Sequence, residues 1–334
     1  MQVLIIGLGS MGKRRIRNLH KLGYYNILGY DARKDRLNEA SKKYGIQTFC
    51  KLSDALRKKP DIMIISTPPD LHLKYANIAL KNNINFFMEL NMFSKDLEVI
   101  IKKMKGKSII GVPSCTLRFH PVVKELKKLL QKNVIGKILV IHHHTGQYLP
   151  DWHTWEDYRK FFVSKRETGG ARETLPFELY WLTYLFSDLK SVYANIDKIS
   201  KLDADIDDIY QVLLEFRNRT YCTLNIDVIS IPSFRETKII GEKGTILCDF
   251  NKGQLKINKG KDWKIIQLKM GKVAKGYVGT TPPETLYEEE LQSFLDAVHK
   301  KKKYPRSLQD ELKTLQILNA IETSHKRGKK IILN

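Results

Sequence analysis

The sequence predicts an α/β protein in two parts: a doubly wound parallel sheet, followed by an α+β domain with a large, mostly antiparallel sheet. Three observations support this fold class. In residues 1–116, short and continuously apolar runs alternate with helical stretches, as parallel βαβ units do. A glycine-rich turn separates the first apolar run from the first helix. Beyond residue 116, longer segments of alternating polarity are joined by turn dipeptides.

The elements of the first domain, residues 1–116, follow from these patterns. Strands that are buried on both faces show unbroken apolar runs, whereas helices repeat their apolar positions every 3.6 residues. The predicted strands are residues 2–6, 25–30, 61–66, 85–88 and 108–112. The predicted helices are residues 11–22, 35–44, 71–82 and 95–104. Strands and helices that alternate in this way predict one doubly wound sheet.

The second predicted domain covers residues 117–334. A helix is expected near residues 121–131, and two helices close the chain. The first of these two spans about 283–300 with a proline in its first turn, and the other starts at Ser307, with Asp310 as capping-box partner, and ends at Gly328. The predicted strands are residues 137–148, 191–199, 210–216, 221–231, 237–240 and 245–250.

The composition excludes several classes of protein. The longest apolar runs fall far short of the ~20 residues that span a bilayer, and a strand and glycine turn occupy the place of a signal peptide. The four cysteines have neither disulfide nor zinc-ligand spacing. Of the three consecutive histidines at 142–144, only two share a face of a strand, so no metal site is predicted. We therefore expect a cytoplasmic protein without a membrane segment.

The net charge of +22 admits three interpretations. Of the 58 cations 43 are Lys, and they are dispersed over both parts of the chain. We interpret the excess as a general property of the surface, with steering of an anionic small substrate as the alternative. Nucleic-acid binding is the third interpretation and is not expected, because base contacts favour Arg. The run Lys300–Lys303 is interpreted as a solvated helix end, where cations suit the helix dipole.

Residues 7–12, Gly-Leu-Gly-Ser-Met-Gly, lie directly between a buried strand and a helix, which is the context of a dinucleotide-binding turn. Gly7 permits the tight turn, Gly9 lets the backbone approach a pyrophosphate, and Gly12 allows close packing of helix and strand. Ser10 and Met11 then open the helix, whose N–H groups face the phosphates.

The cofactor is predicted to be NAD. Asp31 ends the second strand, 19 residues after Gly12, where a carboxylate binds ribose hydroxyls and disfavours a 2′-phosphate. Arg33 and Arg36 follow closely enough to neutralise such a phosphate, so NADP stays open as the second choice.

The third strand leads into further candidates for cofactor binding. Thr67, Pro68 and His72 follow this strand at the carboxyl edge of the sheet, where ligands of doubly wound folds lie. For His72, packing or capping at a helix start is the alternative.

Four segments of the chain resemble the Gfo/Idh/MocA family of oxidoreductases: residues 6–14, 66–72, 117–121 and 241–245. The resemblance implies an N-terminal Rossmann domain and a C-terminal domain with an open-faced sheet through which homodimers or homotetramers form. It implies hydride transfer between NAD(P) and a carbinol of a sugar phosphate, nucleotide sugar or amino sugar. Residues 146–159 look closest to members associated with amino-sugar and nonulosonic acid biosynthesis, which suggests a role in surface glycans.

The chain departs from the family at two motifs. The family usually carries Glu-Lys-Pro after the fourth strand, and the matching residues here are Glu89, Leu90 and Asn91. The resemblance implies that Glu89 contacts the cofactor, but Leu90 cannot relay a proton. In the second motif, a glycine pair is followed by Asp and His; here Phe177 takes the His position, and the Asp position falls at or next to Thr174.

Other side chains of this region are therefore the candidates for acid–base chemistry. A carboxylate beside aromatic groups can have a raised pKa, and the alternative for either glutamate is an ion pair with Arg172 or a neighbour. For the histidine, the alternative is an ordinary loop residue. The catalytic candidates are His153, Tyr158, Glu173 and Glu178. The candidates for binding an anionic sugar-derived substrate are Arg118, Arg159, Lys165 and Arg172.

Two functions of different classes remain at this point. The first is an NAD(P)-dependent oxidoreductase. The second is a non-redox relative that binds the dinucleotide as a structural or sensing ligand, which the loss of Lys and His motivates.

Overall fold

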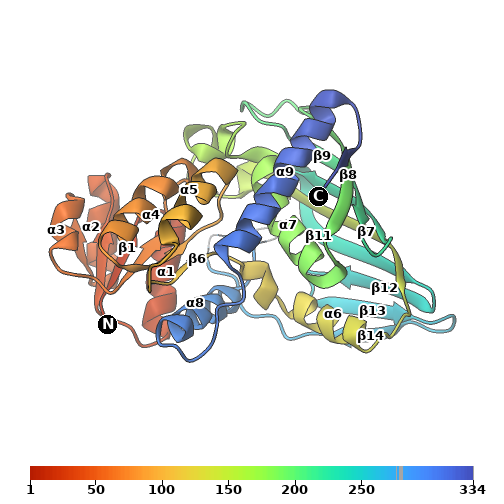
Figure 1. Cartoon of the computed structure of the whole chain (residues 1–334), viewed down its shortest axis with the longest axis horizontal. Coiled ribbons are helices and arrows are strands. Elements are labelled where there is room, and N and C mark those ends of the chain that lie inside the picture. The colour runs from red at the N-terminus through yellow and green to blue at the C-terminus, as the bar shows by residue number, and fades with distance from the viewer. Residues whose placement is uncertain (276, 278–280, 334) are drawn as a thin grey trace. The chain divides into compact units, whose positions relative to one another are not determined.

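The computed structural model describes residues 1–275, 277 and 281–333 (Figure 1). The chain forms two compact units. The first comprises Met1–Thr116 and Glu284–Leu315, and the second comprises Leu117–Pro283 and the chain from Gln316 onward. The first unit therefore differs from the predicted domain 1–116, because residues 284–315 return to it. Ion pairs from Glu284 and Glu290 to arginines of helix α1 account for this return.

The first unit is built on a six-stranded parallel sheet in the order β3-β2-β1-β4-β5-β6. The direction of winding reverses between β1 and β4, and such a reversal is where ligands of open α/β sheets bind. The strands are β1 (Val3–Ile6), β2 (Ile27–Tyr30), β3 (Gln47–Phe49), β4 (Ile62–Ile65), β5 (Asn85–Met88) and β6 (Gly111–Pro113). The helices are α1 (Ser10–Lys21), α2 (Lys34–Tyr44), α3 (Leu52–Leu56), α4 (His72–Lys81), α5 (Ser94–Met104) and α8 (Glu284–Val298).

The sequence missed β3 and α3, and it placed two strands too early. β3 lies at the sheet edge, and none of its three residues is fully buried, so it shows no apolar run. Tyr25 is 72% exposed and lies outside β2. The backbone N–H of Ile110 donates to the side-chain oxygen of Asn85, at 2.8 Å, and regular pairing of β6 begins only at Gly111.

The second unit contains a nine-stranded sheet in the order β14-β13-β12-β11-β7-β10-β9-β8-β15, in which β7 and β10 are parallel and the other neighbours are antiparallel. Together with the parallel sheet, this confirms the predicted fold class. The strands are β7 (Ile138–Tyr148), β8 (Leu189–Asp197), β9 (Ile209–Phe216), β10 (Tyr221–Asp227), β11 (Ile229–Gly241), β12 (Gly244–Asp249), β13 (Gln254–Asn258), β14 (Lys264–Gln267) and β15 (Ile331–Ile332). The helices are α6 (Pro121–Gln131), α7 (Gly170–Phe186) and the C-terminal part of α9 (Leu308–Arg327).

Two sequence predictions need correction here, and one is confirmed. The predicted strand 221–231 is divided, because the Asp227 carboxylate accepts the N–H of Ile229 at 3.1 Å and starts a new strand. The segment 237–240 is the end of that strand, β11. The capping box of α9 is present, with the Ser307 N–H donating to Asp310 and the Asp310 N–H donating to the Ser307 hydroxyl.

One face of the nine-stranded sheet lies against α7, which packs on β9 and β10. The pairing register aligns side chains of the opposite face into a row that crosses neighbouring strands. Tyr193 stands beside Leu213, and Leu213 beside Thr223. Tyr193 and Leu213 are 43% and 55% exposed, so this row presents apolar surface. No helix among the described residues is long and apolar enough to cross a membrane.

Candidate functional site

The glycine turn after β1 has a geometry that requires glycine at two positions. Gly7 has a φ of +89°, and a Cβ atom there would lie 2.6 Å from the Ser66 carbonyl oxygen. A Cβ atom on Gly12 would lie 1.8 Å from the carbonyl oxygen of Gly7. Gly9 is the N-cap of α1 and supplies no side-chain cap to the helix. The N-terminus of α1, with Ser10 and Met11, is therefore a backbone site suited to an anion.

Asp31 lies at the same edge of the sheet, because Tyr30 pairs with Ile6. Its side chain is 6% exposed, and its carboxylate accepts the N–H of Leu8 at 2.7 Å and that of Arg33 at 2.8 Å. These bonds hold the acid directly beside the glycine turn.

The two arginines near Asp31 are both paired with carboxylates. Arg36 lies 3.8 Å from Asp31, and its guanidinium would be 3.3 Å from a Cβ atom on Gly9. Arg33 pairs with Asp35 at 2.6 Å, and this hydrogen bond lowers the pKa of Asp35 to about 2. Because both cations face carboxylates, the site favours a free ribose over a 2′-phosphate.

Thr67 supports the fit of a dinucleotide at this edge. Its Cγ2 atom would lie 3.1 Å from a Cβ atom on Gly7, so the residue adjoins the glycine turn. The Thr67 hydroxyl oxygen is buried and has no hydrogen-bond partner among the described residues. A buried hydroxyl normally has a partner, and a ribose or carboxamide group of the cofactor would supply one. Pro68 follows in the segment that leads to α4.

His72, a predicted cofactor-binding residue, is enclosed by protein groups. Its ring is 1% exposed, Nδ1 contacts the Asn91 side-chain oxygen at 3.0 Å, and Nε2 contacts the Thr67 carbonyl oxygen at 2.9 Å. Burial lowers its pKa. The Asn91 backbone N–H in turn donates to Glu311 at 3.0 Å. His72 therefore stabilises the segment after β4, which was the alternative interpretation.

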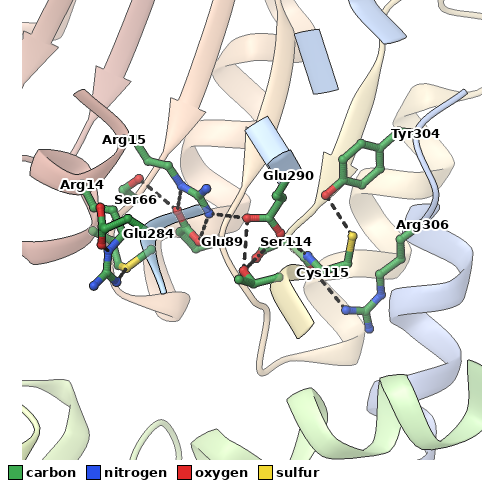
Figure 2. Close-up of polar contacts among 12 residues, drawn as sticks. Arg14, Arg15, Ser66, Glu89, Ser114, Cys115, Glu284, Glu290, Tyr304 and Arg306 are labelled. Atoms are coloured by element: carbon green, nitrogen blue, oxygen red, sulfur yellow. Dashed lines mark hydrogen bonds and ion pairs between the residues drawn. The ribbon is translucent and has the colours of Figure 1, made fainter. Parts of the chain in front are cut away.

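Glu89 follows β5 and is held by an arginine that the sequence analysis missed (Figure 2). The Arg15 guanidinium donates twice to Glu89, at 2.7 and 2.9 Å, and once to Glu290, at 2.9 Å. Arg15 and Glu290 are fully buried, whereas the Glu89 side chain is 15% exposed. The Ser66 hydroxyl also donates to Glu89, at 3.4 Å. Glu89 thus lies at the carboxyl edge of the sheet in a fixed orientation.

Glu290 fixes the end of the neighbouring strand. It accepts hydrogen bonds from the Ser114 hydroxyl at 2.9 Å, the Cys115 N–H at 2.5 Å and the Thr116 hydroxyl at 3.1 Å (Figure 2). The sequence signal for this cluster was the pair of adjacent arginines on α1, a helix that must turn one face toward the sheet. The carboxylates that bind these arginines lie far away in the sequence, so they could not be identified from it.

In the second unit, Glu178, a predicted catalytic residue, is held by several protein groups. This α7 residue is fully buried, and its carboxylate contacts Arg235 at 2.9 Å, His143 at 2.9 Å and the Trp181 N–H at 2.6 Å. Burial alone would raise the pKa of Glu178, but the charges of Arg235 and His143 lower it to about 2. Its contacts join α7 to β7 and β11, which is a structural role.

Arg172, a predicted substrate-binding residue, is likewise held by contacts within the second unit. It is 9% exposed, its Nε atom contacts Glu322 of α9 at 2.5 Å, and its Nη1 atom donates to the Glu167 carbonyl oxygen at 2.5 Å.

Glu173 differs from both of these neighbours. It lies in the first turn of α7, and its Oε2 atom is buried without a hydrogen-bond partner among the described residues. Burial raises the pKa of Glu173 to about 8. A carboxyl group that titrates near neutral pH is suited to proton transfer.

His153 belongs to an aromatic cluster of the second unit. Its ring stacks on Trp155 and Phe161, with centroids 5.0 and 5.1 Å apart, and meets the edge of Tyr277 at 6.2 Å. The Tyr158 hydroxyl accepts the N–H of Asp203 at 3.2 Å. Nothing in these contacts assigns either side chain to catalysis.

The remaining predicted substrate residues are spread over the second unit. Arg159 is exposed and pairs with Asp157 and Asp203, at 2.8 and 3.3 Å. Lys165 is exposed, and the Arg118 guanidinium lies 3.8 Å above the ring of Tyr184. These contacts do not gather the three cations around one anion.

At both motifs where the chain departs from the family, an apolar side chain takes the place of the proton-carrying one. Leu90 is 7% exposed directly after Glu89, and Phe177 is half-buried on α7. Neither side chain carries a proton.

A doubly wound sheet with this glycine turn and Asp31 defines a dinucleotide-binding protein. The chain belongs to the Gfo/Idh/MocA oxidoreductase family. The model for the NAD-binding Rossmann fold of this family matches residues 1–99, and the model for its C-terminal alpha/beta domain matches residues 127–333. These matches confirm the resemblance inferred from the sequence and the predicted NAD-binding domain.

Three curated relatives match parts of the chain. Levoglucosan dehydrogenase of Pseudarthrobacter phenanthrenivorans is 25% identical over 170 residues, which are 46% of this chain and 42% of that protein. The 2,7-anhydro-N-acetylneuraminate hydratase of Mediterraneibacter gnavus is 23% identical over 219 residues, 61% of this chain and 56% of that protein. Oxidoreductase P35 of Formosa agariphila is 26% identical over 110 residues, 32% of this chain and 34% of that protein. The matches thus span between a third and little more than half of these relatives.

Solved structures resemble the whole chain. The WlbA dehydrogenase from Bordetella pertussis, in complex with NADH and UDP-GlcNAcA, has a TM-score of 0.82 at 17% identity, with 100% of this chain and 99% of that chain covered. An oxidoreductase from Agrobacterium radiobacter, in complex with NAD+, L-tartaric acid and magnesium, has a TM-score of 0.87 at 14% identity, with 99% and 98% covered. At these identities, the likeness concerns the fold.

Proposed function

We propose that the protein is an NAD-dependent dehydrogenase or reductase that acts on a carbinol of a sugar derivative: a sugar phosphate, nucleotide sugar or amino sugar. The observation that carries this proposal is the site at the edge of the parallel sheet, where an uncapped helix N-terminus, the glycine turn and the Asp31 carboxylate lie together. Sugar-derived substrates are supported by the names of two relatives, a levoglucosan dehydrogenase and an anhydro-N-acetylneuraminate hydratase.

Glu173 is the proton-transfer group of this proposal. NAD, held at the glycine turn and Asp31, would supply the acceptor for the hydride of the carbinol carbon. In the oxidation, the ionised Glu173 carboxylate takes the hydroxyl proton. In the reverse direction, protonated Glu173 returns that proton to the oxygen of the new carbinol. Three observations support this role: the buried Oε2 atom without a described partner, the raised pKa, and the apolar side chains at Leu90 and Phe177.

An anionic substrate group would be met by an exposed cation. Lys165 is exposed and forms no ion pair among the described residues, whereas Arg159 is already paired with two carboxylates. Lys165 is therefore our first choice for a phosphate or carboxylate of the substrate. A role in cytoplasmic synthesis of surface glycans belongs to the same proposal.

A second copy of the chain is the partner that we propose for the open face of the nine-stranded sheet. The exposed Tyr193 and Leu213, side by side on β8 and β9, supply the apolar centre that such a contact needs.

The test measures dinucleotide binding and turnover separately. Binding of NADH is followed by fluorescence, and reduction of NAD+ by absorbance, over a panel of sugar phosphates, nucleotide sugars and amino sugars. We expect NADH to bind and at least one substrate to turn over, and Glu173→Gln to lose turnover while NADH binding persists. Glu167→Gln is the matched control, because this exposed glutamate just precedes α7. Absence of NADH binding would refute the proposal.

The second candidate function is a non-redox relative that binds the dinucleotide as a structural or sensing ligand. The specific observation in its favour is the loss of a proton-carrying side chain at both Leu90 and Phe177. NADH binding without turnover of any substrate in the panel would favour this function over the first.

A further inference from the structure

The lysine run Lys300–Lys303 takes part in a cavity that the proposed function does not use. The cavity has a volume of about 500 Å³ and is lined wholly by residues of the first unit. It lies among the C-terminal ends of α5 and α8, the approach to edge strand β6, and the start of α9, all labelled in Figure 1. Its size falls within the range of small-molecule sites, about 300–1,000 Å³.

The walls of the cavity divide into an apolar part and a cationic part. Ile101, Met104, Ile110 and Val112 belong to the apolar part. All four lysines of the run line the cavity, and none of them forms an ion pair among the described residues. All four are exposed, so solvent screens part of their mutual repulsion, and an anion bound in the hollow would reduce it further.

The backbone holds the lysines at this place. The Lys301 N–H donates to the Asp296 carbonyl oxygen at 2.8 Å, which closes the end of α8. Lys300 has a φ of +58°, a conformation in which Gly or Asn is usual. A lysine at this φ costs stability relative to glycine.

We propose that this cavity binds a small amphiphilic anion, in which a phosphate, sulfonate or carboxylate is joined to an apolar body. The apolar body occupies the hollow beside Ile101 and Ile110, and the anionic group meets Lys301 and Lys302. The proposed occupant is a free molecule rather than a membrane lipid, because a volume of about 500 Å³ is that of a small-molecule site.

Isothermal calorimetry with octyl phosphate tests the site, with NAD+ at saturation so that the dinucleotide site is covered. Inorganic phosphate and octanol are titrated separately as the head and the tail alone. We expect one octyl phosphate per chain, bound at least about tenfold more tightly than either fragment, since each buried CH₂ group contributes about 0.8 kcal/mol.

Two variants and one control complete the test. The double variant Lys301→Glu/Lys302→Glu and the wall variant Ile101→Glu should each weaken binding by about tenfold or more. Lys326→Glu/Lys329→Glu makes the same change of charge on exposed lysines outside the cavity and should leave binding within about twofold. Equal affinity for inorganic phosphate, equal loss in the control, or binding only to vesicles of anionic lipid would each overturn the proposal.

Discussion

Glu173→Gln should make the protein more stable above neutral pH and, at the same time, less active. The folded structure raises the pKa of this carboxyl from 4.5 to about 8 through burial. A carboxyl whose pKa is raised by folding stabilises the protein fully below pH 4.5, and this contribution is lost as the pH rises toward 8. Gln has nearly the same shape and never ionises, so it avoids the loss.

The magnitude follows from the shift. The full pKa shift corresponds to a change of about 5 kcal/mol in the free energy of unfolding between pH 4 and pH 9. Because part of the Glu173 side chain is in contact with water, we expect about half of this change, roughly 2–3 kcal/mol. Loss of a proton-transfer group should also lower kcat about 10²- to 10⁴-fold.

Urea unfolding at pH 5, 7 and 9 measures the first effect, and steady-state turnover measures the second. Wild type and Glu173→Gln should have similar free energies of unfolding at pH 5 and diverge as the pH rises, with the variant more stable. The Glu167→Gln control should follow wild type throughout. A stability difference that is constant with pH, or a variant that keeps full turnover, would refute the reasoning.

Four further predictions concern other parts of the molecule. Gly12→Ala should abolish NADH binding in a fluorescence titration, because the added Cβ atom would overlap the carbonyl oxygen of Gly7. Asp31→Ala should reduce the preference for NAD over NADP, measured as the ratio of the two Kd values. Glu178→Gln should lower the free energy of unfolding at pH 7 by about 3–5 kcal/mol, since it removes the carboxylate charge that faces the buried Arg235. The wild-type contribution should fade as the pH falls from 4.5 toward 2, the folded pKa of Glu178. Leu213→Lys should shift the protein to monomer in analytical ultracentrifugation, and a monomeric wild type would contradict the proposed interface.

The dinucleotide site could be predicted from the sequence because its determinants are local. The glycine turn is contiguous with β1 and α1, and the register of parallel strands brings Asp31 to the same edge. Glycine spacing and strand ends are sequence properties, so no distant contact had to be known. The exception at this edge is His72, whose ring is enclosed by Asn91 and the Thr67 carbonyl. Nothing local distinguishes a buried histidine of this kind from a ligand-binding one.

The catalytic candidates could not be ranked from the sequence, because their environments depend on distant segments. Glu173 and Glu178 lie five residues apart on α7, yet burial raises the pKa of the first to about 8, while charged neighbours lower that of the second to about 2. The difference comes from Arg235 and His143, which β11 and β7 carry to Glu178 alone. Composition and periodicity contain no information on which glutamate acquires these partners.

The raised pKa of Glu173 also favours one direction of the proposed reaction. At pH 7, a group with a pKa of about 8 is protonated in a ratio of about ten to one. Protonated Glu173 can give a proton to a new hydroxyl, so reduction of a carbonyl by NADH has its acid ready, whereas oxidation has its base in about a tenth of the molecules. We therefore expect kcat for oxidation to rise with pH up to about 8 and kcat for reduction to fall above it, both measured by the absorbance of NADH. Profiles that are flat through this range, or that have the opposite slopes, would show that the proton travels through another group.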